Sequence, residues 1–171
     1  MSIAELLLPE FDQEMANTRK MLECVPDGKF DYKPHEKSMA LGRLAGHTAE
    51  MASWVTMTLT TERLDLTPDM KPSDPKTREA LLGLFDKAAQ EARASLAAAT
   101  DEDMAKMWTL TYAGQTIFSI PRSAVIRGMV MNHVIHHRAQ LGVYLRMMDV
   151  AIPGMYGPSA DEMAGFETAK A

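Results

Sequence analysis

Three histidines of this chain have a spacing and a setting that suit a metal site. His133 and His137 lie four residues apart in the segment NHVIHHR, so in a helix both imidazoles project from the same face, one turn apart. Two nitrogens placed in this way can reach one ion at the roughly 2.0–2.1 Å that a zinc–imidazole bond requires. His136 could replace His137 in a three-residue pair, but the apolar positions of the segment favour the four-residue pair.

A third histidine, His47, lies between Leu44 and Met51 on the otherwise apolar stripe of another expected helix. The pair alone would also fit two polar residues on a solvated face, and a lone inward histidine is more often a satisfied core residue. Two helices that both direct histidine inward are harder to explain in this way, because three neutral imidazoles side by side leave hydrogen-bonding groups unmatched. We therefore predict that His47, His133 and His137 bind one divalent ion.

Three protein ligands leave coordination positions open, which is typical of a catalytic rather than a structural site. The ion would lower the pKa of a bound water toward neutrality, or polarise an incoming thiol or carbonyl. Ligation by imidazole alone suits zinc, nickel, iron or copper. We expect zinc or nickel first, with iron and copper also compatible.

Glu50 and Gln140 are weaker candidates for a catalytic role. Glu50 follows His47 by three residues and could act as a general base, although a solvated glutamate is the simpler interpretation. Gln140 follows His137 by three residues and could hydrogen-bond a ligand or a bound water, or could make an ordinary surface contact. Cys24, near the end of an expected helix, is interpreted as a small buried hydrophobe rather than a reactive thiol.

The hydrophobic periodicity predicts four long helices that would position these residues, over 3–24, 40–61, 76–98 and 121–148. Residues 25–38 and 65–76 are rich in proline and are expected to be loops. Residues 100–120 contain many β-formers around a central Ala-Gly pair, which predicts a short hairpin. The tail after 148 is expected to be irregular, with a single helical turn. Together these elements predict one all-α domain over 1–171, a four-helix bundle with long connections.

The composition narrows the classes of function. Apolar residues make up 46% and charged residues 24% of the chain, as in globular proteins. The net charge of −5 and the lack of a dense Lys/Arg cluster argue against a nucleic-acid partner. The apolar runs are too short for a membrane span, the N-terminal segment has no signal-peptide pattern, and a single cysteine allows no intrachain disulfide. We therefore expect a cytoplasmic protein without membrane contact.

Two segments resemble a known family. FDYKPHEKSMALGRLAGHTAE leads to the first histidine, and NHVIHHRAQLGVYLRMMDVAIPGMYGPS contains the other two. They are similar to the DinB/YfiT-like superfamily of bacterial metal-binding four-helix bundles, and the resemblance runs over nearly the whole chain. It implies a divalent ion bound by one histidine of the second helix and two of the last, which match His47, His133 and His137. Ala139 stands where the family's H-R-G-Q run has glycine, a change that favours the helix.

The resemblance also implies a range of functions. Some relatives are metal-dependent thiol transferases or isomerases that act with low-molecular-weight thiols, others have been treated as hydrolases, and many have no known activity. We expect a metal-dependent enzyme of the thiol transferase or hydrolase type that acts on a small molecule. The alternatives are a non-catalytic metal or small-molecule binding module, for example in a stress response, and a helical dimer without metal. The resemblance further implies a homodimer.

Overall fold

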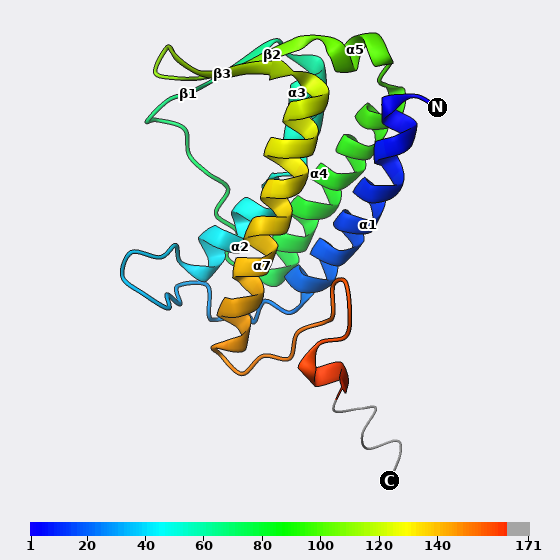
Figure 1. Ribbon diagram of the computed structural model, residues 1–171. Helices are drawn as coiled ribbons and strands as arrows, with labels where there is room; N and C mark the ends of the chain where they lie inside the picture. The colour runs from blue at the N-terminus through cyan, green and yellow to red at the C-terminus, as the bar shows by residue number, and fades with distance from the viewer. Residues whose placement is uncertain (164–171) are drawn as a thin grey trace.

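The computed structural model describes residues 1–163, which are mostly helical with a small sheet at one end of the helices (Figure 1). The helical segments are α1 (Ile3–Glu23), α2 (Leu41–Glu50), α3 (Ser53–Thr60), α4 (Arg78–Ala98), α5 (Asp101–Ala105), α6 (Arg122–Ala124), the π-helical η1 (Val125–Met131) and α7 (Asn132–Arg146). The strands are β1 (Arg63–Leu66), β2 (Met107–Tyr112) and β3 (Gln115–Pro121).

The two longest helices begin and end close to the predicted residues. At the start of α1 the Ser2 hydroxyl accepts a hydrogen bond from the Glu5 backbone N–H at 3.2 Å, and the Glu5 carboxylate accepts one from the Ser2 backbone at 2.7 Å. This capping box satisfies two otherwise unpaired N–H groups. At the start of α4 the Thr77 hydroxyl has the same capping role. Local sequence signals therefore determine these helices.

The prediction of one helix over 40–61 is wrong in its middle, because the structure has two segments, α2 and α3. Met51 and Ala52 keep right-handed helical backbone angles, so the chain continues in a helical path. The backbone N–H groups of Trp54 and Val55 donate to the carbonyls of Met51 and Ala52, which lie three rather than four residues back. The Ser53 hydroxyl donates to the Glu50 carbonyl at 2.7 Å, which offers that carbonyl an alternative partner.

The sheet contains the expected hairpin and one strand that was not predicted. β2 and β3 pair in the antiparallel sense, and the turn between them uses positive φ angles at Ala113 and Gly114. β1 pairs with β2 in the parallel sense, with Arg63 opposite Thr109. The fold is therefore not purely helical. The predicted extended region over 100–120 was also too long, because a capping box at Thr100 starts the short helix α5.

The last predicted helix, 121–148, is divided into α6, the π-helical η1 and α7. The π-helical segment was not predicted, and it lies directly before the helix that contains His133 and His137. π-helical turns inside α-helices often occur at functional sites.

The long helices pack side by side around one core (Figure 1). α1 and α3 pack on α4, and α7 packs on α1 and α2. Because α2 and α7 are neighbours, residues on their facing sides come together although they are far apart in the sequence. Fully buried side chains of this core include Leu22, Leu44, Leu81, Leu96, Val134 and Leu141.

The tail after α7 is irregular as predicted and runs back beneath the helices (Figure 1). The Asn17 amide of α1 donates to the Met155 carbonyl of the tail at 3.2 Å. A helical turn begins at Ala160, and the rest of the predicted turn lies outside the described residues.

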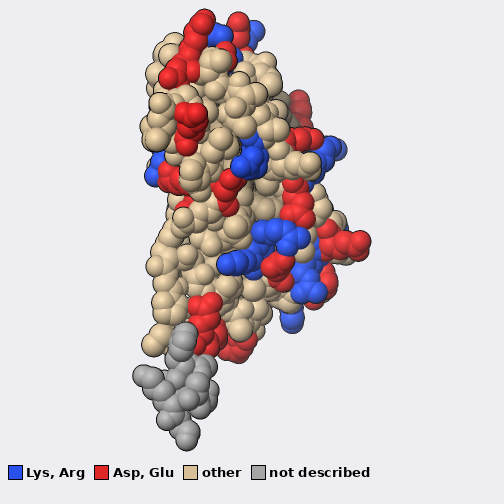
Figure 2. Space-filling view, turned by 90° about the vertical axis from the view of Figure 1, so that its right-hand side faces the viewer, with Lys and Arg blue, Asp and Glu red and all other residues tan. Residues whose placement is uncertain are grey.

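The surface shows how the charges of this acidic chain are distributed. On the face drawn in Figure 2, Lys and Arg side chains are interspersed with Asp and Glu rather than gathered in one patch. Among the described residues, Arg19 pairs with Asp86 and Arg93 pairs with Asp12, so several charges of the chain are matched locally. Within residues 1–163, every helix is too short or too polar to cross a membrane.

Candidate metal centre

The structure brings His47 of α2 together with His133 and His137 of α7. One ring nitrogen from each histidine lies within 4.8 Å of the other two. The ring centroid of His47 is 5.2 Å from that of His133 and 4.7 Å from that of His137. Because α2 packs directly on α7, the fold itself creates this cluster.

Glu50 determines the tautomer of His47. The Nδ1 atom of His47 lies 3.0 Å from Oε1 of Glu50. An ionised carboxylate can only accept hydrogen bonds, so Nδ1 must be the protonated nitrogen. The Nε2 atom of His47 then has a free lone pair. The other Glu50 oxygen accepts a hydrogen bond from the Ser73 backbone N–H at 3.0 Å, which anchors the carboxylate.

Gln140 has the same effect on His137. The Nδ1 atom of His137 lies 2.8 Å from the amide oxygen of Gln140. A carbonyl oxygen accepts and does not donate, so Nδ1 carries the proton and Nε2 has the lone pair. Both residues predicted as weak catalytic candidates thus lie directly behind a histidine. Such outer partners orient metal-binding histidines and raise their basicity.

His133 is the least satisfied of the three rings. Its Nε2 atom lies 2.8 Å from Nε2 of His137. Its buried Nδ1 atom has no hydrogen-bond partner among the described residues. The Met129 carbonyl lies close enough to favour the protonated ring, but no group forms a well-aligned bond with Nδ1.

Burial keeps the rings of α7 neutral. Desolvation lowers the pKa of His137 to about 4, and the neighbouring His133 and His47 rings add to the effect. Desolvation and the His47 ring likewise lower the pKa of His133. The pKa of Glu50 is lowered too, because hydrogen bonds from His47 and Ser73 outweigh the opposing effect of burial. At neutral pH the site therefore has two neutral imidazoles on α7 and an ionised Glu50 carboxylate on α2.

The donor set fits a divalent ion. The two Nδ1 atoms that have partners are protonated, so the free lone pairs of His47 and His137 are on Nε2. Nε2 of His137 also faces Nε2 of His133 within the cluster. Neutral imidazole nitrogen is a common ligand of zinc, nickel, copper and iron. These three residues could hold a metal ion.

A cavity of about 470 Å³ opens on this cluster. His47 and His133 form part of its wall, and Arg43, Glu50 and Lys71 supply its charged groups. The rest of the lining is largely apolar and includes Trp54, Leu66, Met70, Pro72, Leu110 and Met129. A small molecule in this cavity would contact the histidines directly.

The remaining histidines, the cysteine and the two tryptophans are not part of the cluster. His136 and His35 are exposed, and the His35 ring accepts a hydrogen bond from the Lys37 backbone N–H. Cys24 is partly buried rather than fully buried, and desolvation raises the pKa of its thiol. Trp54 lines the cavity, whereas Trp108 is completely buried and its indole N–H donates to the Thr61 hydroxyl.

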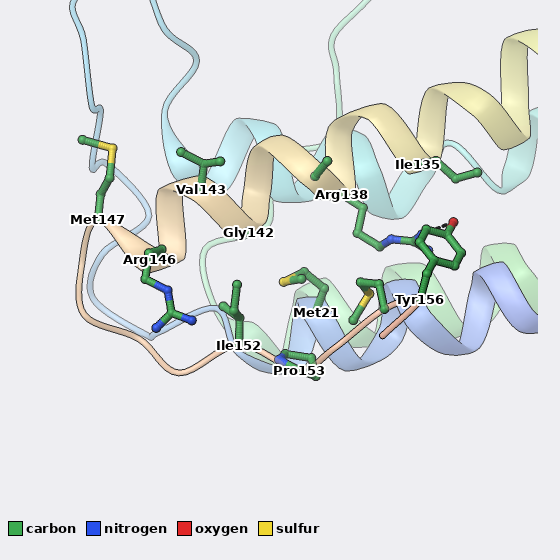
Figure 3. A pocket seen from close by; sticks show the side chains of 12 residues that line it. Met21, Ile135, Arg138, Gly142, Val143, Arg146, Met147, Ile152, Pro153 and Tyr156 are labelled. Atoms are coloured by element: carbon green, nitrogen blue, oxygen red, sulfur yellow. Dashed lines mark hydrogen bonds between the residues drawn. The ribbon is translucent and has the colours of Figure 1, made fainter. Parts of the chain in front are cut away.

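A buried ion pair next to the site was missed from the sequence. Arg138 follows His137 but points to the other side of α7, where its guanidinium lies 2.7 Å from the Glu14 carboxylate of α1. The Tyr156 hydroxyl of the tail lies within hydrogen-bond distance of the Arg138 guanidinium (Figure 3) and also donates to the Glu14 carboxylate. One signal for Glu14 was present, because it shares the apolar stripe of the first helix with Phe11 and Thr18.

Figure 3 also shows a second cavity, of about 460 Å³, between α7, α1 and the tail. Its wall is apolar apart from Arg138, Arg146 and the Tyr156 hydroxyl. Both guanidinium groups are already paired, with Glu14 and Asp161 respectively. This cavity therefore lacks the free donor atoms that the histidine cluster offers.

Fold and site together define a helical protein with a three-histidine cluster that could hold a metal. The sequence model of the DinB family matches residues 1–170, and the chain belongs to this family. It is 25% identical over 161 residues to the uncharacterized protein YrdA of Bacillus subtilis (strain 168), a match that covers 93% of this chain and 91% of the relative.

Two crystal structures of DinB-like proteins have a similar fold. The one from Bacillus cereus ATCC 10987 has a TM-score of 0.70 and 22% identity, covering 89% of this chain and 97% of that one. YjoA from Bacillus subtilis has a TM-score of 0.67 and 20% identity, covering 88% of this chain and 97% of that one. At these identities the likeness concerns the fold.

Proposed function

We propose that this protein binds one divalent metal ion through His47, His133 and His137, within a four-helix bundle of the DinB type. One observation supports the proposal most directly: one ring nitrogen of each histidine lies within 4.8 Å of the other two. The Nδ1 atoms of His47 and His137 bond instead to Glu50 and Gln140. Zinc or nickel is our first choice, because both accept imidazole ligands readily.

The hydrogen bonds of His133 favour an ion over a metal-free cluster. If His133 Nε2 carries the proton, it can donate to His137 Nε2, but the buried Nδ1 lone pair stays unpaired. If Nδ1 carries the proton, two lone pairs face each other at 2.8 Å. A shared cation removes that repulsion and converts both lone pairs into ligands.

We further propose that the site is catalytic and acts on a small molecule, as a thiol transferase or a hydrolase. An ion with open positions would supply Lewis acidity toward a thiol, a water or a carbonyl group. The chain itself supplies a cavity whose apolar wall, including Trp54, can bind the body of a substrate beside His47 and His133. Glu50 and Gln140 would hold two of the rings in a fixed orientation.

Elemental analysis after reconstitution with zinc or nickel tests the metal site. We expect about one equivalent per chain, from the number of clustered histidines. His133→Ala should lower the metal affinity sharply and leave the far-ultraviolet circular dichroism spectrum largely unchanged. His136→Ala is a matched control, because this exposed histidine lies on the same helix outside the cluster. Less than a few tenths of an equivalent in the unmodified chain would contradict the proposal.

Catalysis is tested separately with the fully loaded protein. Panels of thiol-conjugation reactions, with low-molecular-weight thiols and electrophiles, and of hydrolysable esters are the relevant assays. Turnover that disappears in His133→Ala and persists in His136→Ala would support an enzyme. Absence of turnover in both panels at full metal occupancy would count against it.

A non-catalytic binding module is the second candidate, and one observation favours it. Among the described residues that line the cavity, Glu50 is the one carboxylate, and each of its oxygens already accepts a hydrogen bond. A general base must be able to take a proton from its substrate. If metal and small molecules bind but no reaction follows, this second function replaces the first.

A further inference from the structure

The charged groups of the cavity beside the histidines indicate which small molecules it accepts. The chain as a whole is acidic, with a net charge of −5. Among the described residues, those that line this cavity nevertheless include two cations, Arg43 and Lys71, and one carboxylate, Glu50. The balance in the cavity is therefore opposite in sign to that of the whole protein.

The single carboxylate is already engaged by neighbouring groups of the protein. Oε1 of Glu50 accepts a hydrogen bond from His47 and lies 3.5 Å from the Arg43 guanidinium. Oε2 accepts a hydrogen bond from the Ser73 backbone N–H. Both oxygens of Glu50 are thus engaged by groups of the protein itself.

The cations have donors to spare. Arg43 makes one long contact with Glu50, whereas a guanidinium has five N–H donors in a planar fork that matches a carboxylate. Its side chain is 34% exposed, so a ligand can reach it. Lys71 is exposed in the loop between β1 and α4 and forms no ion pair within residues 1–163. Asp69 lies in the same loop but is not part of the lining.

The positions of these groups suggest how a ligand would lie. Arg43, His47 and Glu50 follow one another at steps of four and three residues, so they share one face of α2. Arg43 is thus one helical turn from a histidine of the cluster. The apolar wall, with Trp54 and Leu110, lines the same cavity. A ligand with an anionic group and an apolar body can meet both kinds of surface in one cavity.

We infer that the cavity selects small organic anions, molecules with a carboxylate or similar group on an apolar body, and that Lys71 and Arg43 recognise the negative charge. This inference rests on the proposed function, since it names the substrate class of the same site. The anionic group lies at the two cations while the rest of the molecule extends over the apolar wall toward the histidines. Cationic and uncharged analogues of the same shape bind less tightly.

A pair of probes that differ only in charge tests the inference. The probes are 3-phenylpropionate and its uncharged amide, 3-phenylpropanamide, and binding is followed by the tryptophan fluorescence of the full chain. Trp54 lines the cavity, while Trp108 is completely buried and is not part of the lining. Binding is measured with zinc-loaded protein and with chelator-treated protein, and the zinc content of each sample is determined.

The unmodified chain should bind the carboxylate about tenfold more tightly than the amide, as expected for charge-assisted hydrogen bonds at partly exposed cations. In Lys71→Met this preference should fall to about threefold or less, and Lys71→Arg should retain it. Lys87→Met is the matched control, because it removes an exposed lysine of α4 outside the cavity lining. Arg43→Met should also lower the preference, and its zinc content shows whether the histidine cluster is intact.

The outcomes separate this inference from the metal proposal. If zinc binds but carboxylate and amide bind equally, or Lys71→Met behaves like the unmodified chain, the inference is overturned and the metal site stands. If zinc does not bind but the charge preference is present and depends on Lys71, the metal proposal fails and the inference stands. If neither probe binds in either form of the protein, the inference is also overturned.

Discussion

Removal of the Glu50 side chain should weaken metal binding without unfolding the protein. Glu50 accepts a hydrogen bond from His47 at 3.0 Å and holds this ring in the tautomer that presents Nε2 to the cluster. Its side chain is 20% exposed, so water can replace only part of this interaction. Loss of such a partner typically lowers metal affinity by about 10- to 100-fold, or about 1.4–2.8 kcal/mol.

Two substitutions should give graded effects. Glu50→Ala removes the acceptor and also the bond from the Ser73 backbone, and should give the full loss of about 10- to 100-fold. Glu50→Gln keeps an acceptor oxygen but loses the charge. Because charge-assisted hydrogen bonds are about twice as strong as neutral ones, it should lose about half of this free energy, or roughly 3- to 10-fold in affinity.

A competition titration of zinc against a chromophoric chelator at neutral pH and constant ionic strength measures these affinities. Glu91→Gln is the control, because it removes an exposed carboxylate of α4 that does not line the cavity. Thermal unfolding of each variant, with and without zinc, separates a local effect from loss of the fold. The control Glu91→Gln should bind zinc as tightly as the unmodified chain. If Glu50→Ala also binds zinc within twofold of the unmodified chain, the role assigned to Glu50 is refuted.

Three further predictions concern stability. Glu14→Ala leaves the 2% exposed Arg138 guanidinium without its counter-ion, so the free energy of unfolding in urea should fall by about 3–5 kcal/mol. A fall below about 1 kcal/mol would show that the ion pair is dispensable for stability. Gly46→Ala places a Cβ 2.8 Å from the Pro75 ring, and calorimetry should show a lower melting temperature from a strain of about 1–3 kcal/mol; an unchanged temperature would mean that the loop moves freely. The pKa of His137 is lowered from 6.5 to about 4 by burial, so the unfolded chain binds more protons in this window. The free energy of unfolding of the metal-free protein should therefore be fully retained above pH 6.5 and fall as the pH drops toward 4. This fall should be steeper than in the His137→Gln variant. If the free energy of unfolding depends equally on pH in both proteins, this histidine is not the cause.

The long helices were predictable because their signals are local. Apolar residues at three- and four-residue steps, together with caps such as Ser2 with Glu5, define α1 and α4 to within about two residues. The spacing of His133 and His137 on α7 is a local property of the same kind. The capping box at Thr100 was also a local signal, so α5 could have been predicted and was overlooked.

Other features depend on contacts between distant residues. β1 is a strand because it pairs with β2 more than forty residues away, and nothing in its four residues alone requires this. The break between α2 and α3 is accompanied by a local hydrogen bond from the Ser53 hydroxyl to the Glu50 carbonyl, and the hydrophobic pattern gave no sign of it. The π-helical segment before α7 likewise had no signal in the hydrophobic pattern.

The residues that can bind a metal are evident before the fold is known, because imidazole chemistry and a four-residue spacing on one helix are properties of the chain. The meeting of His47 with the other two depends on the fold, because the packing of α2 on α7 joins residues 86 and 90 positions apart, at 47, 133 and 137. The fold also decided that Arg138 faces away toward Glu14, whereas Glu50 and Gln140 lie behind their rings through a three-residue spacing on the same helix. A side chain's partner depends on which helix faces lie against each other, and this is determined by burial over the whole core rather than by any single segment.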